Sequence, residues 1–552
     1  MQPKSNAGAS LAALALMALA LIAAWWWPNR PTAGNVAMPD AKFESLSYAP
    51  YRPGQSPLTD NFPTTAEVDQ DLTLLAAHSL GIRSYSSVEG KFNLPALARR
   101  HHLKLWLGIW LSADRAANAR EMAAGIAAAR AYPDVVDRVV VGNEVLLRHD
   151  LPVAELIADI LAVKRAVPEK VTTADVWEDF LRYPQIVPYL DIVTVHILPY
   201  WEDRPTDLAG SMKHVKAVLT ELAARFPGKK LAIGETGWPS RGRWRRDAAP
   251  SLVNEAVYLR RFIDLADRLH VDYNIIEAFD QDWKYHNEGT VGANWGIWTD
   301  TRHLKFPLFG PVRENPDWGT DAALSVLCGL ALAGLATLRG VTPARAVMAM
   351  ALGGAMGFAI AGTAPVLYDR FAAIAGIANM LGQAVLACLF VLRDDGPARD
   401  GKAATEAFRS VLRLRWPAAW RGPVGADALC DDLNFLFLWT AAILQVLLAY
   451  DPRYRDFPLP TFAVPVVIAA IRLLRGRNGS HLRRADYVVM AMLLGGAIFS
   501  AVQEGPRNLQ SLIWNGAACL LVVERWLTRQ KCQETLGANK RGKDATAKEA
   551  TF

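Results

Sequence analysis

Two glutamates stand out because each follows a β-branched run that predicts a buried strand. Glu144 closes the stretch Val-Gly-Asn-Glu at 141–144, and Glu235 lies in Ile-Gly-Glu-Thr-Gly-Trp-Pro-Ser at 233–240. If both strands belong to one parallel barrel, both carboxyl groups lie at its carboxyl end, where chemistry takes place. Such a pair can cleave a glycosidic bond: one carboxyl group protonates the departing oxygen, and the other attacks the anomeric carbon or activates water. The two glutamates therefore predict glycoside chemistry.

Other side chains at predicted strand ends supply candidates for substrate binding. They are Tyr85, Asn143, His196, Tyr200, Trp201, Trp238, Glu277, Asp280, Trp283 and Lys284. The three tryptophans are expected to be platforms for the apolar faces of sugar rings. A structural hydrogen-bonding role suits Glu277 and Asp280 nearly as well as substrate contact. For His196 a structural role is favoured over that of a base, since the reaction already has both carboxylates.

Eight short β-branched runs, separated by Ala-rich helical stretches, must position these residues. We expect strands at 43–48, 81–85, 104–110, 138–145, 171–177, 191–197, 230–235 and 272–279. Eight strands alternating with helices in under about 300 residues predict a (β/α)8 TIM barrel. An open doubly wound sheet is the alternative, but no Gly-rich dinucleotide turn follows the first predicted strand.

At these residues the sequence resembles glycoside hydrolase family 17, which comprises β-1,3-glucanases and glucanosyltransferases. The resemblance rests on Val-Gly-Asn-Glu-Val at 141–145 and Ile-Gly-Glu-Thr-Gly-Trp-Pro-Ser at 233–240. Two further stretches support it: Gly-Ile-Arg-Ser-Tyr at 81–85 and Glu-Ala-Phe-Asp-Gln-Asp-Trp-Lys at 277–284. It covers roughly residues 40–310, and four motifs in the family's order make chance agreement improbable.

The resemblance implies a retaining mechanism with Glu235 as nucleophile and Glu144 as acid/base. It also implies that Asn143 binds the sugar 2-hydroxyl and that Tyr85 and Tyr200 line the subsite around the nucleophile. The sequence departs from the plant pattern at His196, where plant members favour Asn, and at Gln281, where they have Glu. The motifs leave open whether water or a sugar hydroxyl accepts the glycosyl unit, and whether a β-1,3 or β-1,6 linkage forms.

The first unusual segment is an uncharged apolar run from Leu11 to Trp27 that ends in three consecutive tryptophans. Tryptophans suit a membrane interface, whereas a cleaved signal peptide ends in small residues. We therefore expect residues 1–28 to be an uncleaved signal anchor, with a cleaved signal as the alternative. The resemblance to membrane-bound bacterial members then implies a soluble domain at 29–319 in the periplasm.

After Asp321 the chain becomes strongly apolar, with runs near 322–338, 346–367, 371–392, 433–450, 458–471, 487–501 and 509–523. We expect residues 320–530 to form an all-α transmembrane bundle of about seven helices, followed by a basic tail at 531–552. Alternate loops and the tail carry 21 Lys and Arg, against 4 in the opposite loops. This asymmetry predicts a multi-pass protein of the bacterial inner membrane with a cytoplasmic C-terminus.

The net charge of the whole chain is +6, and it is distributed unevenly between the predicted barrel and the apolar part that follows. Residues 28–319 carry 34 basic and 37 acidic residues, so the predicted barrel has no electrostatic footprint for nucleic acid. We expect no metal and no cofactor. The expected partners are a β-glucan, the lipid bilayer and, as a further candidate, a membrane glucan synthase. The alternative function is a catalytically silent ectodomain that binds or senses glucan.

Overall fold

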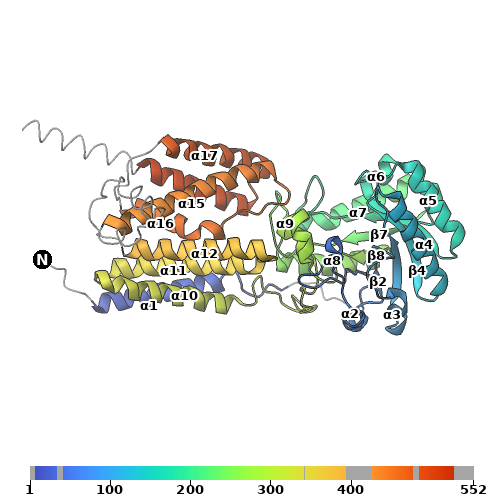
Figure 1. The fold of residues 1–552 in the computed structure, drawn as a ribbon, viewed down its shortest axis with the longest axis horizontal. Helices are drawn as coiled ribbons and strands as arrows, with labels where there is room; N and C mark the ends of the chain where they lie inside the picture. Colours follow the sequence, from blue (N-terminus) through green and yellow to red (C-terminus); the bar gives the residue numbers. More distant parts are fainter. Residues whose placement is uncertain (1–6, 34–41, 341, 393–423, 476–483, 528–552) are drawn as a thin grey trace, which may run out of the picture. The chain divides into compact units, whose positions relative to one another are not determined.

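The computed structural model describes the chain except for residues 1–6, 34–41, 341, 393–423, 476–483 and 528–552 (Figure 1). The chain forms two compact units: Pro31–Glu314, and Met1–Arg30 together with Asn315–Phe552. The basic loops predicted within 393–423 and 476–483, and the tail predicted at 531–552, lie outside the described residues.

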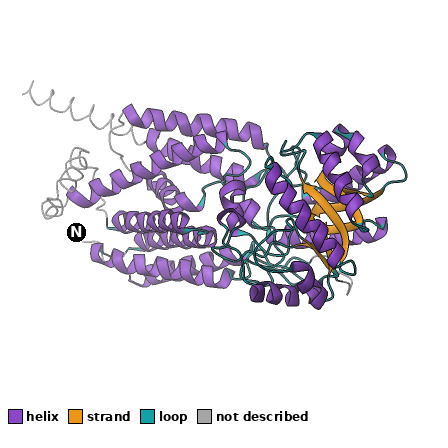
Figure 2. Cartoon of the chain, turned by 45° about the vertical axis from the view of Figure 1, so that its right-hand side comes forward, coloured by secondary structure: helices purple, strands orange, loops and turns teal. Residues whose placement is uncertain are grey.

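The first unit is a closed barrel of eight parallel strands, which confirms the predicted fold class. Each strand pairs with the next along the chain, and β1 closes the ring by pairing with β8. Figure 2 shows these strands gathered in one sheet with helices around it. The strands are β1 Leu46–Ser47, β2 Gly81–Arg83, β3 Lys104–Ile109, β4 Val136–Asn143, β5 Lys170–Val176, β6 Ile192–His196, β7 Lys230–Thr236 and β8 Asp272–Ile275.

Helices of this unit follow the strands in the expected alternation. They are α2 Thr65–His78, α3 Leu94–Arg100, α4 Arg115–Ala131, α5 Val153–Ala166, α6 Trp177–Arg182, α7 Leu208–Arg225, α8 Leu252–Leu269 and α9 Tyr285–Ala293. Thr64 and Glu67 form a capping box at the start of α2, and Ser251 caps α8 through the Asn254 N–H. These caps satisfy backbone donors that a helix start leaves unpaired.

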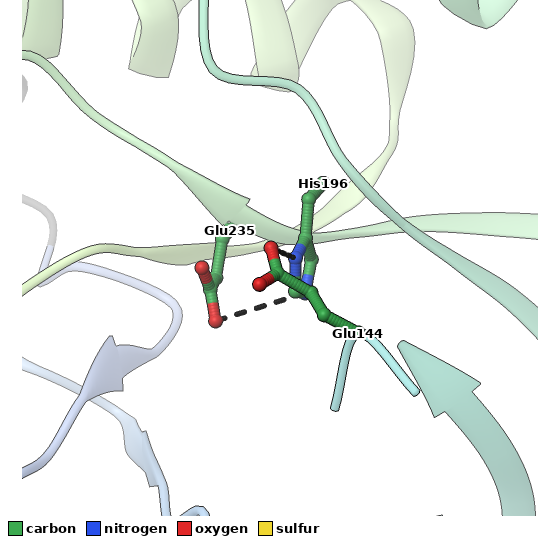
Figure 3. A group of neighbouring side chains, drawn as sticks. All are labelled: Glu144, His196 and Glu235. Atoms are coloured by element: carbon green, nitrogen blue, oxygen red, sulfur yellow. Dashed lines mark hydrogen bonds and ion pairs between the residues drawn. The ribbon is translucent and has the colours of Figure 1, made fainter. Parts of the chain in front are cut away.

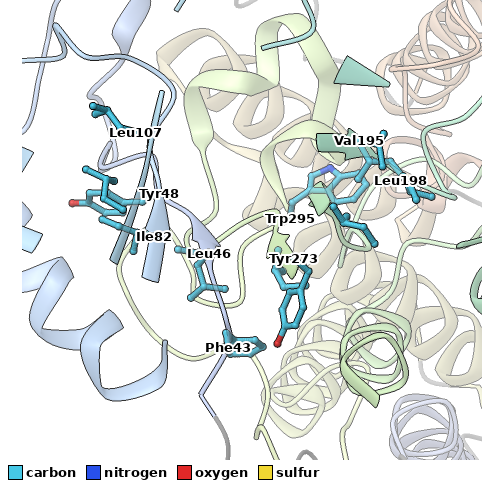
Figure 4. Packing of buried hydrophobic residues seen from close by; sticks show 14 of the residues in the cluster. Phe43, Leu46, Tyr48, Ile82, Leu107, Val195, Leu198, Tyr273 and Trp295 are labelled. Carbon is cyan, nitrogen blue, oxygen red and sulfur yellow. The ribbon is translucent and has the colours of Figure 1, made fainter. Parts of the chain in front are cut away.

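Apolar residues of the strands and helices form one continuous core, part of which is drawn in Figure 4. A separate layer unites Trp106 with Val140, Ala174, Ile192 and Ala232, one residue from each of β3 to β7. Trp106 is therefore a core residue. The first and last strands are shorter than predicted, because pairing around β1 and β8 involves only a few residues.

The second unit is helical. Its helices are α1 Ala7–Trp26, α10 Trp318–Ala336, α11 Pro343–Thr363, α12 Arg370–Val391, α15 Val424–Tyr450, α16 Ala463–Arg475, α17 Arg484–Glu504 and a further helix at 509–527. Six helical segments in the described residues have the length and composition to cross a membrane: α1 and five of the seven predicted C-terminal segments. Two predicted segments are not among them. One is α16, which has 13 described residues; the 3₁₀ turn Pro460–Phe462 precedes it, and Pro465 lies in its first turn. The other is 509–527, which contains Gln510, Asn515, Glu524 and Arg525.

Small residues and amides hold this unit together. A Cβ at Gly353 would lie 2.1 Å from the Gly329 nitrogen, so α10 and α11 approach closely through glycine. Gln383 on α12 donates to the Pro460 carbonyl (3.0 Å) and accepts from the Val464 N–H (3.0 Å) at the start of α16. On α1, Trp25 donates to Ser325 of α10 through its indole N–H (2.9 Å). Gln383 therefore links α12 to the start of α16.

Candidate active site

Three barrel strands bring Glu144, His196 and Glu235 together (Figure 3). Glu235 lies on β7, His196 is the last residue of β6 and pairs in register with Glu235, and Glu144 directly follows β4. One carboxylate oxygen of each glutamate and one ring nitrogen of His196 all lie within 4.8 Å of one another. Carboxyl groups of retaining glycosidases are about 5–5.5 Å apart, whereas those of inverting enzymes are about 6.5–9.5 Å apart. The separation between the two glutamates therefore suits direct attack by one of them.

The backbone at Glu144 turns sharply out of β4. Its φ is +51°, in the left-handed region, and its N–H donates to the Ala174 carbonyl on β5 (2.8 Å). The side chain keeps 25% of its surface exposed, and its Oε1 lies 2.9 Å from His196 Nδ1. Burial raises the pKa of Glu144, but the hydrogen bond from His196, the charge of His196 when it is protonated, and the charges of Arg148 and Arg83 outweigh it. The pKa consequently lies below its ordinary value.

Glu235 is held by two donors and is much less accessible, with 6% of its side chain exposed. Its Oε1 accepts from Arg83 Nη1 (3.0 Å) and lies 2.9 Å from the Tyr85 hydroxyl. Burial and the negative charge of Glu235 raise the pKa of Tyr85 well above its ordinary value, so the phenol keeps its proton. An anionic carboxylate fixed between a guanidinium and a phenol is suited to nucleophilic attack.

Arg83 is a central residue that the sequence interpretation missed, although it lies inside the quoted 81–85 motif. Its side chain is 1% exposed, and Nη1 also donates to the Gly234 carbonyl (2.7 Å). Nη2 donates to Asn143 Oδ1 (2.5 Å). Because a guanidinium only donates, the amide oxygen of Asn143 must face it, and the Asn143 NH₂ group faces the other way. The available signal was a charged residue two positions before Tyr85 in a strand of otherwise apolar character.

Backbone and polar side chains beneath the carboxylates support this arrangement. Asn274 on β8 donates to Ser47 Oγ (2.7 Å) and to the Gly234 carbonyl (2.9 Å), and Ser47 in turn contacts the Tyr85 hydroxyl (2.9 Å). A Cβ at Gly234 would lie 3.0 Å from the His196 ring, so only glycine leaves room for that ring. Residues from β1, β2, β7 and β8 therefore fix the orientation of Glu235.

Residues that follow β8 form a separate polar cluster next to this centre. Lys284 donates to Glu277 Oε1 (2.7 Å), and Lys305 donates to Asp280 Oδ1 (2.9 Å). Burial raises the pKa of Glu277 to about 7 against the opposing charge of Lys284. Burial likewise raises the pKa of Asp280. Both carboxyl groups are almost fully buried and paired with lysines.

Gln281, whose role the sequence left open, links the loop to the first strand region. Its Nε2 donates to the Ala49 carbonyl (2.9 Å), and its Oε1 accepts from the Trp283 indole (2.9 Å). Trp283 is half-buried and meets the Tyr51 ring edge-on at 6.0 Å. Gln281 thus orients the Trp283 ring, part of which remains accessible.

The three tryptophans expected to be sugar platforms and Tyr200, expected to line the subsite around the nucleophile, divide into two groups. Trp201 and Trp283 are half-buried and keep accessible ring surface. Tyr200 and Trp238 are both fully buried, so the expectation that they contact sugar differs from the structure. Their polar atoms are used internally: the Tyr200 hydroxyl donates to the Arg243 carbonyl (2.6 Å), and the Trp238 indole donates to the Ala249 carbonyl (2.9 Å). The Tyr200 ring packs against Trp201 (centroids 5.3 Å apart) and Trp295 (6.0 Å), and Trp238 packs against Tyr200 (6.2 Å).

Glu144, His196 and Glu235 also have the donor types of a metal site. Arg83 Nη1, however, lies 3.0 Å from Glu235 Oε1 and 3.5 Å from His196 Nε2. It thereby occupies the space next to two of the three donor atoms with a permanent positive charge. A second cation would be repelled there. The group is therefore better described as two carboxylates, paired with Arg83 and His196, than as a metal centre.

Residues 45–296 match the family described as the BtgE/BtgC glycoside hydrolase domain. A glucan 1,3-beta-glucosidase of Candida albicans is 28% identical over 262 residues, which cover 43% of this chain and 84% of that protein. A glucan 1,3-beta-glucosidase of Saccharomyces cerevisiae is 23% identical over 267 residues, with 44% and 85% covered. A crystal structure of a family 17 beta-1,3-glucanosyltransferase from Rhizomucor miehei is 26% identical. It covers 48% of this chain and 97% of its own, with a TM-score of 0.42.

Proposed function

We propose that this chain is a membrane-anchored, retaining enzyme of glycoside hydrolase family 17 that acts on β-1,3-glucan. It cleaves the glucan and transfers the glycosyl unit to a glucan hydroxyl, with a β-1,3 or β-1,6 linkage, or to water. The observation that carries this proposal is the placement of Glu144 and Glu235 within 4.8 Å of each other, with Arg83 and Tyr85 holding Glu235. The curated relatives act on the same class of glucan by name.

The first step uses the two carboxyl groups in different protonation states. A carboxylate oxygen of Glu235 bonds to the anomeric carbon while the glycosidic C–O bond breaks, and protonated Glu144 gives its proton to the departing oxygen. The product is a glycosyl ester on Glu235 and a shortened glucan. The Asn143 NH₂ group, turned away from Arg83, is available to the sugar 2-hydroxyl.

The second step reverses these roles. The Glu144 carboxylate takes a proton from water or from a sugar hydroxyl, whose oxygen attacks the anomeric carbon and displaces Glu235. Two inversions give net retention of the β configuration. Trp201 and Trp283, the half-buried tryptophans, are the residues proposed to stack on glucan rings.

The experiment is to incubate the full chain, in detergent, with a defined β-1,3-glucan oligosaccharide and to analyse product masses and linkages. Longer or branched products show transfer, and only shorter products show hydrolysis; both support a glucan-active enzyme. Unchanged oligosaccharide that still binds the protein would contradict the proposal and support a silent glucan-binding domain.

The membrane part of the proposal rests on the six helices that are long and apolar enough to cross a bilayer. We propose that α1 remains attached as an anchor, since Trp25 bonds to Ser325 and Leu21 packs on Gly354 of the same unit. The charge asymmetry of the loops supports a periplasmic barrel and a cytoplasmic C-terminus. A membrane glucan synthase remains the proposed source of substrate. Protease accessibility of the barrel in spheroplasts tests the orientation.

Arg83→Lys is expected to lower kcat/KM on a β-1,3-glucan oligosaccharide by about 10²-fold, because one ammonium group cannot reproduce the bidentate geometry of Arg83. The charge beside Glu235 is kept, while the simultaneous contacts with Gly234, Glu235 and Asn143 are lost. Arg99→Lys is the matched control, since Arg99 is exposed and pairs with Asp134. Equal kcat/KM in wild type and Arg83→Lys, with unchanged thermal unfolding, would refute this role.

A further inference from the structure

His196 occupies a position that the two-carboxylate mechanism does not require. It is 1% exposed, so its ring has no surface for a substrate, although the sequence placed it among candidate binding residues. Its Nδ1 lies 2.9 Å from Glu144 Oε1, and its Nε2 lies 3.7 Å from Glu235 Oε1 and 3.5 Å from Arg83 Nη1. The His196 ring lies beside both reacting carboxylates (Figure 3), and its Nε2 also faces the Arg83 guanidinium.

The neighbours of the ring determine where its proton lies. Glu144 Oε1 lies 2.9 Å from His196 Nδ1, and an ionised carboxylate only accepts hydrogen bonds. The hydrogen in this contact is therefore on Nδ1, and it points at Glu144 Oε1. A proton donor aimed at a carboxylate stabilises its charged form.

Other charged groups around this pair come from several elements. Arg148, in the loop after β4, and Arg83, on β2, favour a negative Glu144. Glu235 on β7, Asp175 on β5 and Asp179 on α6 add negative charge, although burial raises the pKa of Asp175 to about 7. Asp175 accepts from the Leu146 and Val176 N–H groups, so it contacts backbone rather than the His196 ring.

We propose that His196 is a positioning residue for Glu144: its Nδ1–H holds that carboxylate in one orientation and stabilises the deprotonated form. This inference rests on the proposed function. In the second step Glu144 must accept a proton, and the structure shows it already bonded in the form that does so. In the first step the same contact is unfavourable, because Glu144 must carry a proton.

The consequence is a specific pH dependence. The pKa of Glu144 in the free protein lies below its ordinary value, and kcat/KM reports the protonation states of the free enzyme. Because the first step needs protonated Glu144, kcat/KM falls as pH rises through that pKa. Loss of the Nδ1–H donor raises the pKa of Glu144. The fall of kcat/KM with rising pH, which is the alkaline limb of the pH profile, then moves to higher pH.

Two substitutions distinguish the contribution of Nδ1 from that of Nε2. His196→Asn carries its amide N–H at the same number of bonds from Cβ as Nδ1, and His196→Gln carries its amide at the position of Nε2. We expect His196→Gln to move the alkaline limb of kcat/KM upward by about one pH unit, and His196→Asn to leave its midpoint near that of wild type. The full chain in detergent and a β-1,3-glucan oligosaccharide are used throughout, with thermal unfolding of each variant.

An unchanged alkaline limb in folded His196→Gln, or equal shifts in both variants, would overturn the inference. If His196→Gln does not fold, Glu144→Asp retracts the carboxylate from Nδ1 by one methylene and is expected to move the limb in the same direction. A limb unmoved in that variant overturns the inference too. Wild-type protein that leaves the oligosaccharide intact at every pH refutes instead the proposed function.

Discussion

Replacement of Glu235 by Gln is expected to lower turnover of a β-1,3-glucan oligosaccharide by about 10⁴-fold or more. Removing one member of a catalytic unit abolishes nearly all of the rate acceleration that the whole unit provides. The amide has nearly the shape of the carboxylate but is a poor nucleophile toward the anomeric carbon. Its oxygen can still accept from Arg83 and Tyr85, whose donors lie 3.0 and 2.9 Å from Glu235 Oε1. The loss is therefore expected in kcat, with the fold retained.

The measurement is kcat and KM for the full chain in detergent, together with thermal unfolding. Glu155→Gln is the matched control, since the Glu155 side chain is 49% exposed and pairs with Arg115. It should behave as wild type. Glu235→Gln with more than a tenth of wild-type kcat would show that Glu235 is not the nucleophile.

Glu144→Ala is expected to show a loss that depends on the leaving group. On an unactivated oligosaccharide we expect about 10²–10⁴-fold lower kcat/KM, the range that general acid–base catalysis contributes. On an aryl β-glycoside with a dinitrophenol leaving group, the first step needs no proton donor, so kcat/KM should change little. The second step then limits turnover because no base activates the acceptor.

Azide tests this assignment because it attacks the glycosyl ester without a base. With Glu144→Ala, azide is expected to accelerate turnover and give a β-glycosyl azide, because the ester on Glu235 has the inverted configuration. With Glu235→Ala, azide takes the place of the nucleophile and should give the α-glycosyl azide. The opposite pairing of variant and anomer would exchange the two roles, and no acceleration in either variant would refute them.

The barrel and the two glutamates could be predicted because their signals are local. Val139, Val140 and Val141 mark β4 as a buried strand, and Glu144 follows within the same motif. Glu235 lies in the long run 233–240, and the closed barrel brings strands from distant parts of the chain to one end. The structure places both carboxylates within 4.8 Å, a distance that no local pattern contains.

The roles of Arg83, Tyr200 and Trp238 could not be predicted, because burial depends on distant neighbours. Arg83 acquires its role from Gly234 and Glu235, which lie about 150 residues later in the chain. Tyr200 and Trp238 resemble sugar platforms in sequence, yet the loop around Arg243 and Ala249 covers their polar atoms.

In the helical unit, hydropathy predicted the positions of the segments better than their lengths. Prolines at 460 and 465 lie at the start of α16, where Gln383 bonds to the Pro460 carbonyl and the Val464 N–H. A count of apolar residues does not register this exchange of helical hydrogen bonds for side-chain hydrogen bonds.

The central claim is that a glycosyl ester forms on Glu235, and trapping that ester tests it most directly. A β-laminaribiosyl fluoride with fluorine in place of the 2-hydroxyl reacts without a proton donor, and the second step is slow because the fluorine destabilises the oxocarbenium-like transition state. We predict that the full chain gains the mass of one fluoroglycosyl unit, located by peptide mapping on Glu235. An adduct on another residue, or turnover of glucan with inverted product and no adduct, would contradict the account.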